Sequence, residues 1–153
     1  METMVGTKYY FTTMYLILCT GLGGRDGALV IDLKHFQKFS MDRTTWIATI
    51  GAGTRLKDVT KKLYAAGRRA IAHGTCPSVG IGGHASIGGL GPTSRMWGAT
   101  LDHIEEMTVV LADGSVQTTS ATINPDLFFA CRGSAAGFCI IVEYKCESIN
   151  YYH

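Results

Sequence analysis

The sequence feature that most constrains this chain is a glycine-rich stretch at residues 74–91, in which seven of eighteen positions are glycine. Glycine reaches positive φ freely and has no side chain to hold another group away from the backbone. Ordering so many glycines costs conformational entropy, and a simple connection needs only one or two turn residues. We therefore interpret the stretch as a backbone surface shaped to lie against a ligand, with Cys76 and His84 projecting from it. A flat, polar or anionic ligand suits such a surface, because clustered backbone N–H groups bind phosphates.

The composition indicates a folded chain of about one domain, or a piece of one. Of its 153 residues, 46% are hydrophobic and 17% are charged, as in a globular protein with a core. The formal net charge is only +2, and no run of lysine or arginine exceeds two residues. We therefore expect no nucleic-acid partner and no membrane partner.

The five cysteines are Cys19, Cys76, Cys131, Cys139 and Cys146, an odd number that leaves at least one thiol unpaired within the chain. The sequence has no Cys-x-x-Cys pair and no zinc-ribbon spacing. The last three cysteines lie in apolar segments, where the simplest interpretation is a buried free thiol that packs as a small hydrophobic residue. This pattern does not indicate a redox compartment.

The histidines near Cys76 allow other interpretations. His73, Cys76, His84 and His103 could be metal ligands, but their spacing matches no common zinc site, so we expect no metal. Cys76 could instead be a catalytic thiol with His73 or His84 as its partner. The plainest alternative is a glycine-rich turn in which the cysteine and the histidines are incidental.

Residues 80–85 also match the dinucleotide-binding pattern G-x-G-x-x-[GA]. That fingerprint requires a strand before it and a helix that starts inside it. Here a Cys-Pro pair comes before, and residues 86–92, with three glycines and a proline, are not expected to be helical. We therefore reject a Rossmann fold.

Two helices are predicted. Apolar residues recur at i, i+3 and i+7 over residues 55–66, which predicts an amphipathic helix with Thr54 as its N-cap and Gly67 at its end. Asn124 before a proline predicts the start of a second helix over residues 125–132.

Short β-branched and apolar segments between turn residues predict five to seven strands, so the chain is expected to have an α+β fold. Residues 9–19 are either another buried strand or the apolar part of a signal peptide, and they are too short to span a membrane. Residues 92–100 are expected to be irregular. The other predicted strands are residues 28–33, 44–50, 69–72, 105–111, 116–119 and 139–146.

Three motifs follow one another in the middle of the chain: residues 74–84 (GTCPSVGIGGH), 87–98 (IGGLGPTSRMWG) and 101–103 (LDH). Together they resemble the PCMH-type FAD-binding domain of berberine-bridge-enzyme-like oxidases, in the vanillyl-alcohol oxidase superfamily. The resemblance is closest to the fungal glucooligosaccharide oxidases. It covers residues 21–147, and the flanking segments that agree are 21–33, 48–53, 126–129 and 136–138.

This resemblance implies FAD as cofactor, with the sulfur of Cys76 attached to C6 of the flavin ring. A loop on the flavin ring and the pyrophosphate, and a strand on the other side of the cofactor, would supply the remaining contacts. The residues that match these two segments are Val79, Gly80, Gly83, His84, Gly88 and Gly89 in the loop, and Gly137, Ile140 and Ile141 in the strand.

The resemblance also implies an FAD-dependent oxidase that acts on a CH–OH group, with a small alcohol or a sugar as substrate and O₂ as the electron acceptor. A sugar or oligosaccharide is the expected substrate class. The alternative is a catalytically inactive, truncated flavin-binding fragment. Secretion is usual for the family.

The chain also departs from the family pattern. Family members carry a second FAD attachment, a histidine in an Arg-[Ser/Gly]-Gly-Gly-His loop upstream of the segment matching residues 21–27, whereas the first histidine here is His35. Cys139 stands where a glycine is usual. The family's substrate domain, with its tyrosine base, should follow residue 153, so no catalytic residue is assigned.

We therefore expect an incomplete PCMH-type FAD-binding domain that lacks the N-terminal lobe and the substrate domain, from a truncated or mispredicted gene product. Its expected division is an atypical segment at residues 1–20, the partial domain at 21–147 and a tail at 148–153.

Overall fold

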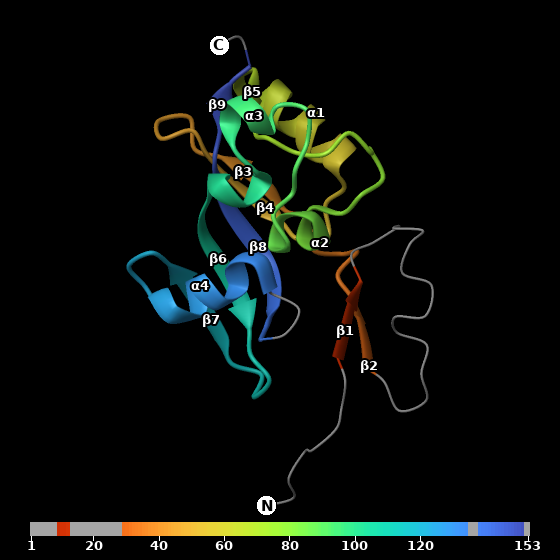
Figure 1. Ribbon diagram of the computed structural model, residues 1–153, viewed down its shortest axis with the longest axis vertical. Coiled ribbons are helices and arrows are strands. Elements are labelled where there is room, and N and C mark those ends of the chain that lie inside the picture. Colours follow the sequence, from red (N-terminus) through yellow and green to blue (C-terminus); the bar gives the residue numbers. More distant parts are fainter. Residues whose placement is uncertain (1–8, 13–28, 135–137, 152–153) are drawn as a thin grey trace, which may run out of the picture.

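A five-stranded antiparallel sheet is the centre of this computed structural model, which describes residues 9–12, 29–134 and 138–151 (Figure 1). Its strand order is β3-β4-β8-β6-β7. In a second, parallel pair, β1 lies beside β2, and β5 pairs antiparallel with β9. The strands are β1 (Tyr9–Thr12), β2 (Leu29–Asp32), β3 (Phe39–Met41), β4 (Ile47–Gly51), β5 (Arg69–Ala70), β6 (Ile104–Val110), β7 (Val116–Ser120), β8 (Ile140–Glu147) and β9 (Ile149–Asn150).

Helices pack on one face of the central sheet, which confirms the α+β fold class. They are α1 (Leu56–Gly67), α2 (Ile81–Ser86) and α4 (Pro125–Ser134), while the short α3 (Ser94–Trp97) and a 3₁₀ turn (Thr100–His103) lead into β6. Within the described residues, none of these helices has the length and apolar character needed to cross a membrane. The core joins buried side chains of sheet and helices, among them Ala48, Ile50, Leu56, Val59, Leu63, Ile81, Ala85, Met107, Val109, Phe128, Cys131, Ile141, Tyr144 and Cys146.

The start of α1 is held by the glycine-rich stretch, and the prediction of Thr54 as its N-cap is wrong. Arg55 has the extended N-cap conformation, and no side-chain capping bond is found there among the described residues. The N–H of Leu56 instead donates to the carbonyl of Val79, at 2.8 Å. A backbone acceptor from another segment thus satisfies a helix N–H that has no partner within the helix. The Thr54 hydroxyl is buried and has no hydrogen-bond partner among the described residues.

The end of α1 at Gly67 is confirmed, but the glycine is needed for packing. The left-handed residue is Arg68, with φ +54°, and its N–H donates to the carbonyl of Tyr64 at 2.7 Å. A Cβ on Gly67 would lie 2.5 Å from the ring of Trp46. Glycine therefore allows the last turn of α1 to approach that indole ring closely.

The predicted strands of the central sheet are confirmed to within about three residues. The strand expected over 44–50 begins only at Ile47, because Trp46 has φ +58° and Asp42 accepts the N–H of Thr44 in a turn. The strand expected over 69–72 is shorter and ends at Ala70.

Two short strands, β3 and β9, were not predicted, because neither has enough residues to show an alternating pattern. The second helix loses regular backbone at Arg132 and Gly133, as predicted. β1 agrees with the strand alternative for residues 9–12. The rest of 1–20, the segment 21–27 and Gly137 lie outside the described residues.

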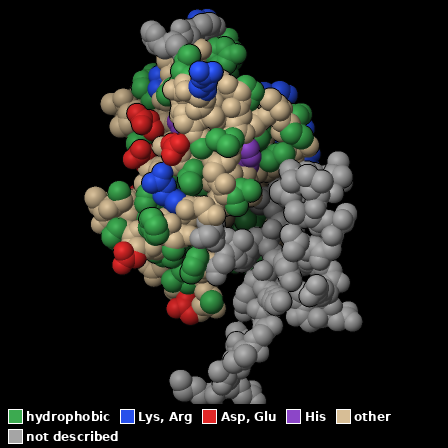
Figure 2. Space-filling model, in the orientation of Figure 1, with side chains coloured by type: hydrophobic (Ala, Val, Ile, Leu, Met, Phe, Trp, Pro, Cys, Tyr) green, Lys and Arg blue, Asp and Glu red, His purple; other side chains and the backbone are tan. Residues whose placement is uncertain are grey.

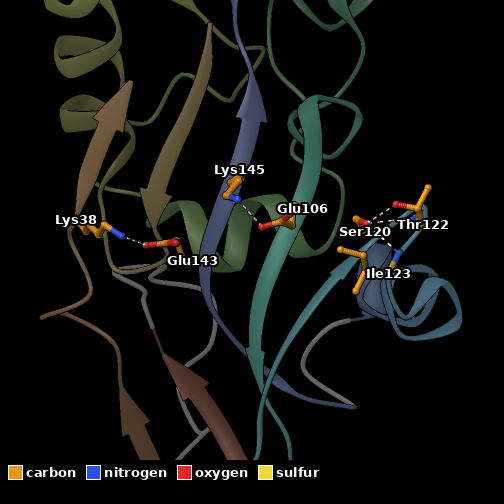
Figure 3. Close-up of polar contacts among 7 residues, drawn as sticks. All are labelled: Lys38, Glu106, Ser120, Thr122, Ile123, Glu143 and Lys145. Carbon is orange, nitrogen blue, oxygen red and sulfur yellow. Dashed lines mark hydrogen bonds and ion pairs between the residues drawn. The ribbon is translucent and has the colours of Figure 1, made fainter. Parts of the chain in front are cut away.

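Ion pairs join the strands on the face of the sheet that points away from the helices (Figure 3). The ammonium of Lys145 on β8 lies 2.7 Å from the carboxylate of Glu106, its cross-strand partner on β6. Lys38, just before β3, lies 3.1 Å from Glu143 on β8. Glu143 and Lys145 flank the buried Tyr144, so they point to the opposite face. Such partly exposed pairs contribute little to stability but favour the observed register.

Candidate functional site

A short helix starts inside the glycine-rich stretch, which corrects one part of the sequence analysis. α2 begins at Ile81 and ends at Ser86, so a helix does begin within the pattern at residues 80–85. The strand that a dinucleotide-binding fingerprint needs is not formed, because Gly80 makes only an isolated bridge with Arg55. The rejection of a Rossmann fold therefore stands on the missing strand alone.

Tertiary hydrogen bonds hold α2 in place despite its two glycines. The N–H groups of Ile81 and Gly82 donate to carbonyls of the β4–α1 connection, at 2.9 and 3.0 Å. The hydroxyl of Tyr144, reaching up from β8, donates to the carbonyl of Gly82 at 3.0 Å. Ile81 and Ala85 are fully buried. These contacts compensate for the low helix propensity of glycine, and no local pattern predicts them.

The glycines after α2 serve two different purposes. Gly89 has φ +81°, and a Cβ there would lie 2.4 Å from the hydroxyl of Thr100, so its close contact is with this chain itself. Gly88 has φ +116° and no atom within 4 Å of a Cβ position, so it borders open space. Of these two predicted site residues, Gly88 is the one whose surroundings leave room for a ligand.

His84 holds the backbone just before Cys76. Its Nε2 accepts the N–H of Gly74 at 2.9 Å. Burial, and to a smaller extent the neighbouring His73, lowers the pKa of His84, which keeps the ring neutral and able to accept. A Cβ on Gly74 would lie 3.0 Å from the imidazole, so glycine favours this contact.

His103, considered above as a possible ligand, has a structural role. Its Nε2 accepts the N–H of Ala72 at 3.0 Å, and its Nδ1 faces the carbonyl of Glu147 at 3.2 Å, so Nδ1 carries the proton. Burial lowers the pKa of His103 and favours the neutral ring. The described residues contain no group of three or more His, Cys, Asp or Glu side chains that could hold a metal ion.

Cys76 presents an exposed thiol at the start of the site. Its sulfur lies 3.3 Å from the hydroxyl of Ser78. Hydrogen bonds from the Ser78 side chain and backbone lower the pKa of Cys76, because they stabilise the thiolate. Among the described residues, neither His73 nor His84 hydrogen-bonds to this sulfur. The geometry therefore favours a nucleophilic thiol assisted by serine, and not a Cys-His pair.

The other predicted residues lie around α2 and on β8. Val79 and Ile141 are buried, and Ile140 is partly buried at the start of β8. Gly83 lies on α2, and its carbonyl accepts the hydroxyl of Ser86 at 3.1 Å. The structure therefore brings the loop residues together, whereas the side chain of Ile141 points into the core.

The surface around the site is mixed in charge. On the face seen in Figure 2, lysine, arginine, acidic and hydrophobic side chains are interspersed. The glycine-rich stretch itself carries two exposed apolar side chains, Ile87 and Leu90, which are 74% and 75% exposed.

A groove of about 470 Å³ lies elsewhere, between β7 and α4. Among the described residues, no predicted site residue lines it, and Asp126 is the one charged side chain in its wall. Its lining residues are Leu111, Gln117, Asn124, Pro125, Asp126 and Leu127.

Comparisons with known proteins identify the family. The sequence model of a family described as FAD binding domain matches residues 17–120. A xylooligosaccharide oxidase from Thermothelomyces thermophilus is 46% identical over 125 residues, which are 82% of this chain and 25% of that protein. The chain spans about a quarter of the length of the curated relatives it matches.

Solved structures share the fold. A berberine-bridge-enzyme-like protein from Physcomitrella patens has a TM-score of 0.88 at 38% identity, over 95% of this chain and 32% of that one. A glucooligosaccharide oxidase from Acremonium strictum, described by its 6-S-cysteinyl, 8α-N1-histidyl FAD, has a TM-score of 0.87 at 38% identity, over 94% of this chain and 30% of that one.

Proposed function

The chain belongs to the family of FAD-binding domains found in oligosaccharide oxidases and berberine-bridge-enzyme-like proteins, and from this premise we propose that it is the flavin-attaching part of an FAD-dependent oxidase. FAD is the cofactor of this family. In the proposal, Cys76 holds FAD covalently, and the oxidase acts on a CH–OH group of a sugar or oligosaccharide.

The observation that carries the proposal is the state of Cys76. Its thiol is exposed, and Ser78 lowers its pKa. A thiolate is the nucleophilic form of cysteine, so the sulfur is prepared to add to an electron-poor ring. Gly88, with open space where a side chain would stand, leaves room for a flat group beside the loop. These features fit a flavin, and an attached cysteinyl FAD is described for the A. strictum relative.

The residues of this chain would bind and position the cofactor. FAD, when bound, would accept the hydride from the alcohol carbon and pass electrons to O₂. The loop residues Val79, Gly80 and Gly83, together with Gly88 after α2, would lie against the ring and the pyrophosphate. Gly89 would hold the loop against Thr100. His84 would hold the backbone before Cys76 in a fixed conformation. Ile140 would border the cofactor from β8, and Ile141 would support it from the core.

A second function remains in competition, that of a flavin-binding fragment without turnover. The chain spans about a quarter of the length of the curated relative it matches, so turnover by the whole oxidase is tested separately from FAD attachment. A histidine for a second attachment is missing from residues 1–34 of this sequence.

The attachment is tested on the purified 153-residue chain after incubation with FAD. We expect an acid-stable flavin absorbance and an intact mass raised by one FAD, and we expect Cys76→Ala to abolish both. Cys146→Ala is the matched control, because Cys146 is buried in the core. A colourless chain of unmodified mass would contradict the attachment. Peroxide release on oligosaccharides would separate the oxidase from the fragment without turnover.

A further inference from the structure

Two of the buried cysteines meet in the core. Cys131 lies in the last regular turn of α4 and is 0% exposed, and Cys139 lies just before β8 and is 6% exposed. Their sulfur atoms are 2.8 Å apart, although the residues are eight positions apart in the sequence. From the sequence alone, both cysteines are expected to be separate free thiols, because no spacing rule pairs them.

We propose that Cys131 and Cys139 form an intramolecular disulfide that ties the end of α4 to the start of β8. The two sulfur atoms of a disulfide are about 2.05 Å apart, so the separation seen here exceeds the length of that bond by less than 1 Å. Small movements of the two side chains would therefore be enough to form the bond. The proposal concerns the fold and is independent of FAD binding.

The surroundings of the pair favour this bond over a metal or an ion pair. Phe128 and Ile141 belong to the same buried cluster as the two sulfurs. No third ligand residue completes a metal site among the described residues. Gly133 interrupts α4 just after Cys131, with φ +104°, a conformation that a side chain disfavours.

Cys131 is the sulfur that would react first. The hydrogen bond with Cys131, together with burial, raises the pKa of Cys139, and the same hydrogen bond lowers the pKa of Cys131. Cys131 is therefore the better thiolate of the pair.

The oxidant is a low-molecular-weight disulfide, for which oxidised glutathione is the probe. The thiolate of Cys131 attacks one glutathione sulfur, forms a mixed disulfide and releases one glutathione thiolate. Cys139 then attacks the sulfur of Cys131 and releases the second glutathione. Two cysteine thiols are oxidised, one glutathione disulfide is reduced to two thiols, and the two cysteine protons end on the released glutathiones.

The experiment uses the full 153-residue chain, equilibrated with oxidised glutathione both in its folded form and after unfolding and refolding in urea, so that access to the buried thiols does not limit the reaction. Trypsin cuts after Arg132, between the two cysteines. We expect a non-reducing digest to contain residues 96–132 linked to residues 133–145. We also expect a Tm about 5–10 °C higher than in the reduced chain.

Two matched variants make the result specific. Cys139→Ser should abolish both the linked peptide and the rise in Tm on oxidation. Cys146→Ser, which removes another buried thiol of β8, should leave both unchanged. Free or singly glutathionylated Cys131 and Cys139 after urea treatment, or a link from either residue to Cys19, would overturn the proposal.

Discussion

At the scale of single residues, the chemistry of Cys76 depends on a residue two positions away. Ser78 contacts the sulfur through its hydroxyl and lowers the pKa of the thiol. Cys146 shows the opposite case, since burial raises the pKa of its thiol to about 12. The motif around Cys76 identifies the cysteine but indicates no role for Ser78, because a serine in a turn is common for other reasons.

The first prediction therefore concerns Ser78→Ala. Loss of the hydroxyl removes a hydrogen bond to the thiolate, so the pKa of Cys76 should rise. The midpoint of a plot of alkylation rate against pH should move to higher pH, with slower alkylation at pH 7. Mass spectrometry of the peptide spanning residues 70–95 isolates Cys76 from the other cysteines.

Ser115→Ala is the control for this prediction, because Ser115 lies in the turn before β7. It should leave the profile of Cys76 alkylation unchanged. If Ser78→Ala gives the wild-type midpoint, the serine does not activate the thiol.

At the scale of elements, the segment from α2 to β6 is shaped by close packing of its backbone. The N–H of Thr100 donates to the carbonyl of Gly89 at 2.9 Å, and the Thr100 hydroxyl donates to the carbonyl of Ala72 at 2.8 Å. Thr100 is fully buried. The turn after α2 therefore packs tightly against the 3₁₀ turn, and position 89 has room for the hydrogen of glycine but not for a side chain.

The second prediction is that Gly89→Ala destabilises the chain by about 2–4 kcal/mol. Alanine at φ +81° is strained, and its Cβ would overlap the Thr100 side chain. Gly114→Ala is the matched control, because Gly114 has φ +83° but no atom within 4 Å of a Cβ position. That variant should cost only about 1–2 kcal/mol.

Urea unfolding at pH 7 measures both variants. Equal losses would show that backbone strain alone, and not the contact with Thr100, explains the requirement for glycine at position 89.

At the scale of the whole molecule, two neutral histidines link distant parts of the fold. His84 accepts a hydrogen bond from the N–H of Gly74, just before Cys76. His103 is hydrogen-bonded both to Ala72, after β5, and to Glu147, at the end of β8. Burial lowers the pKa of both rings. Their charge state is therefore coupled to the stability of the fold.

The third prediction is that the free energy of unfolding falls as the pH drops below about 6.5, the pKa of an unfolded histidine. In that range the unfolded chain takes up protons while the folded chain, with its lowered pKa values, does not. The contribution of these two histidines to the free energy of unfolding is complete above pH 6.5, and it is lost as the pH falls toward their pKa in the folded state. Urea midpoints between pH 8 and pH 5 measure this slope.

The control for the pH dependence is His35→Gln, since His35 is exposed. His35→Gln should leave the slope of unfolding free energy against pH unchanged, whereas His84→Gln should reduce that slope. Three aspartates affect the stability of the fold only at more acidic pH. Hydrogen bonds from nearby residues lower the pKa of each carboxyl below 3.8, so the stabilisation that these hydrogen bonds give is lost only when the pH falls well below the range measured here. The three are Asp32, Asp42 and Asp113. A flat profile from pH 7 to pH 5 would contradict the prediction.

The sequence by itself determined those helices and strands whose residue pattern lies within one short segment. It also determined the family. The spacing of Leu56, Val59 and Leu63 was enough to predict α1, because all three side chains share one helix face and are buried there. The ordered motifs around Cys76 were enough to indicate an FAD-binding domain, because they depend on residue types at fixed spacing.

Only the tertiary structure decided what holds these parts together. α2 forms because Tyr144 and the β4–α1 connection supply hydrogen bonds from distant positions. Cys131 and Cys139 meet because α4 and β8 pack in one core. Such contacts depend on how segments pack in space, and hydrophobic periodicity along the chain carries no information about which distant residue will be the partner.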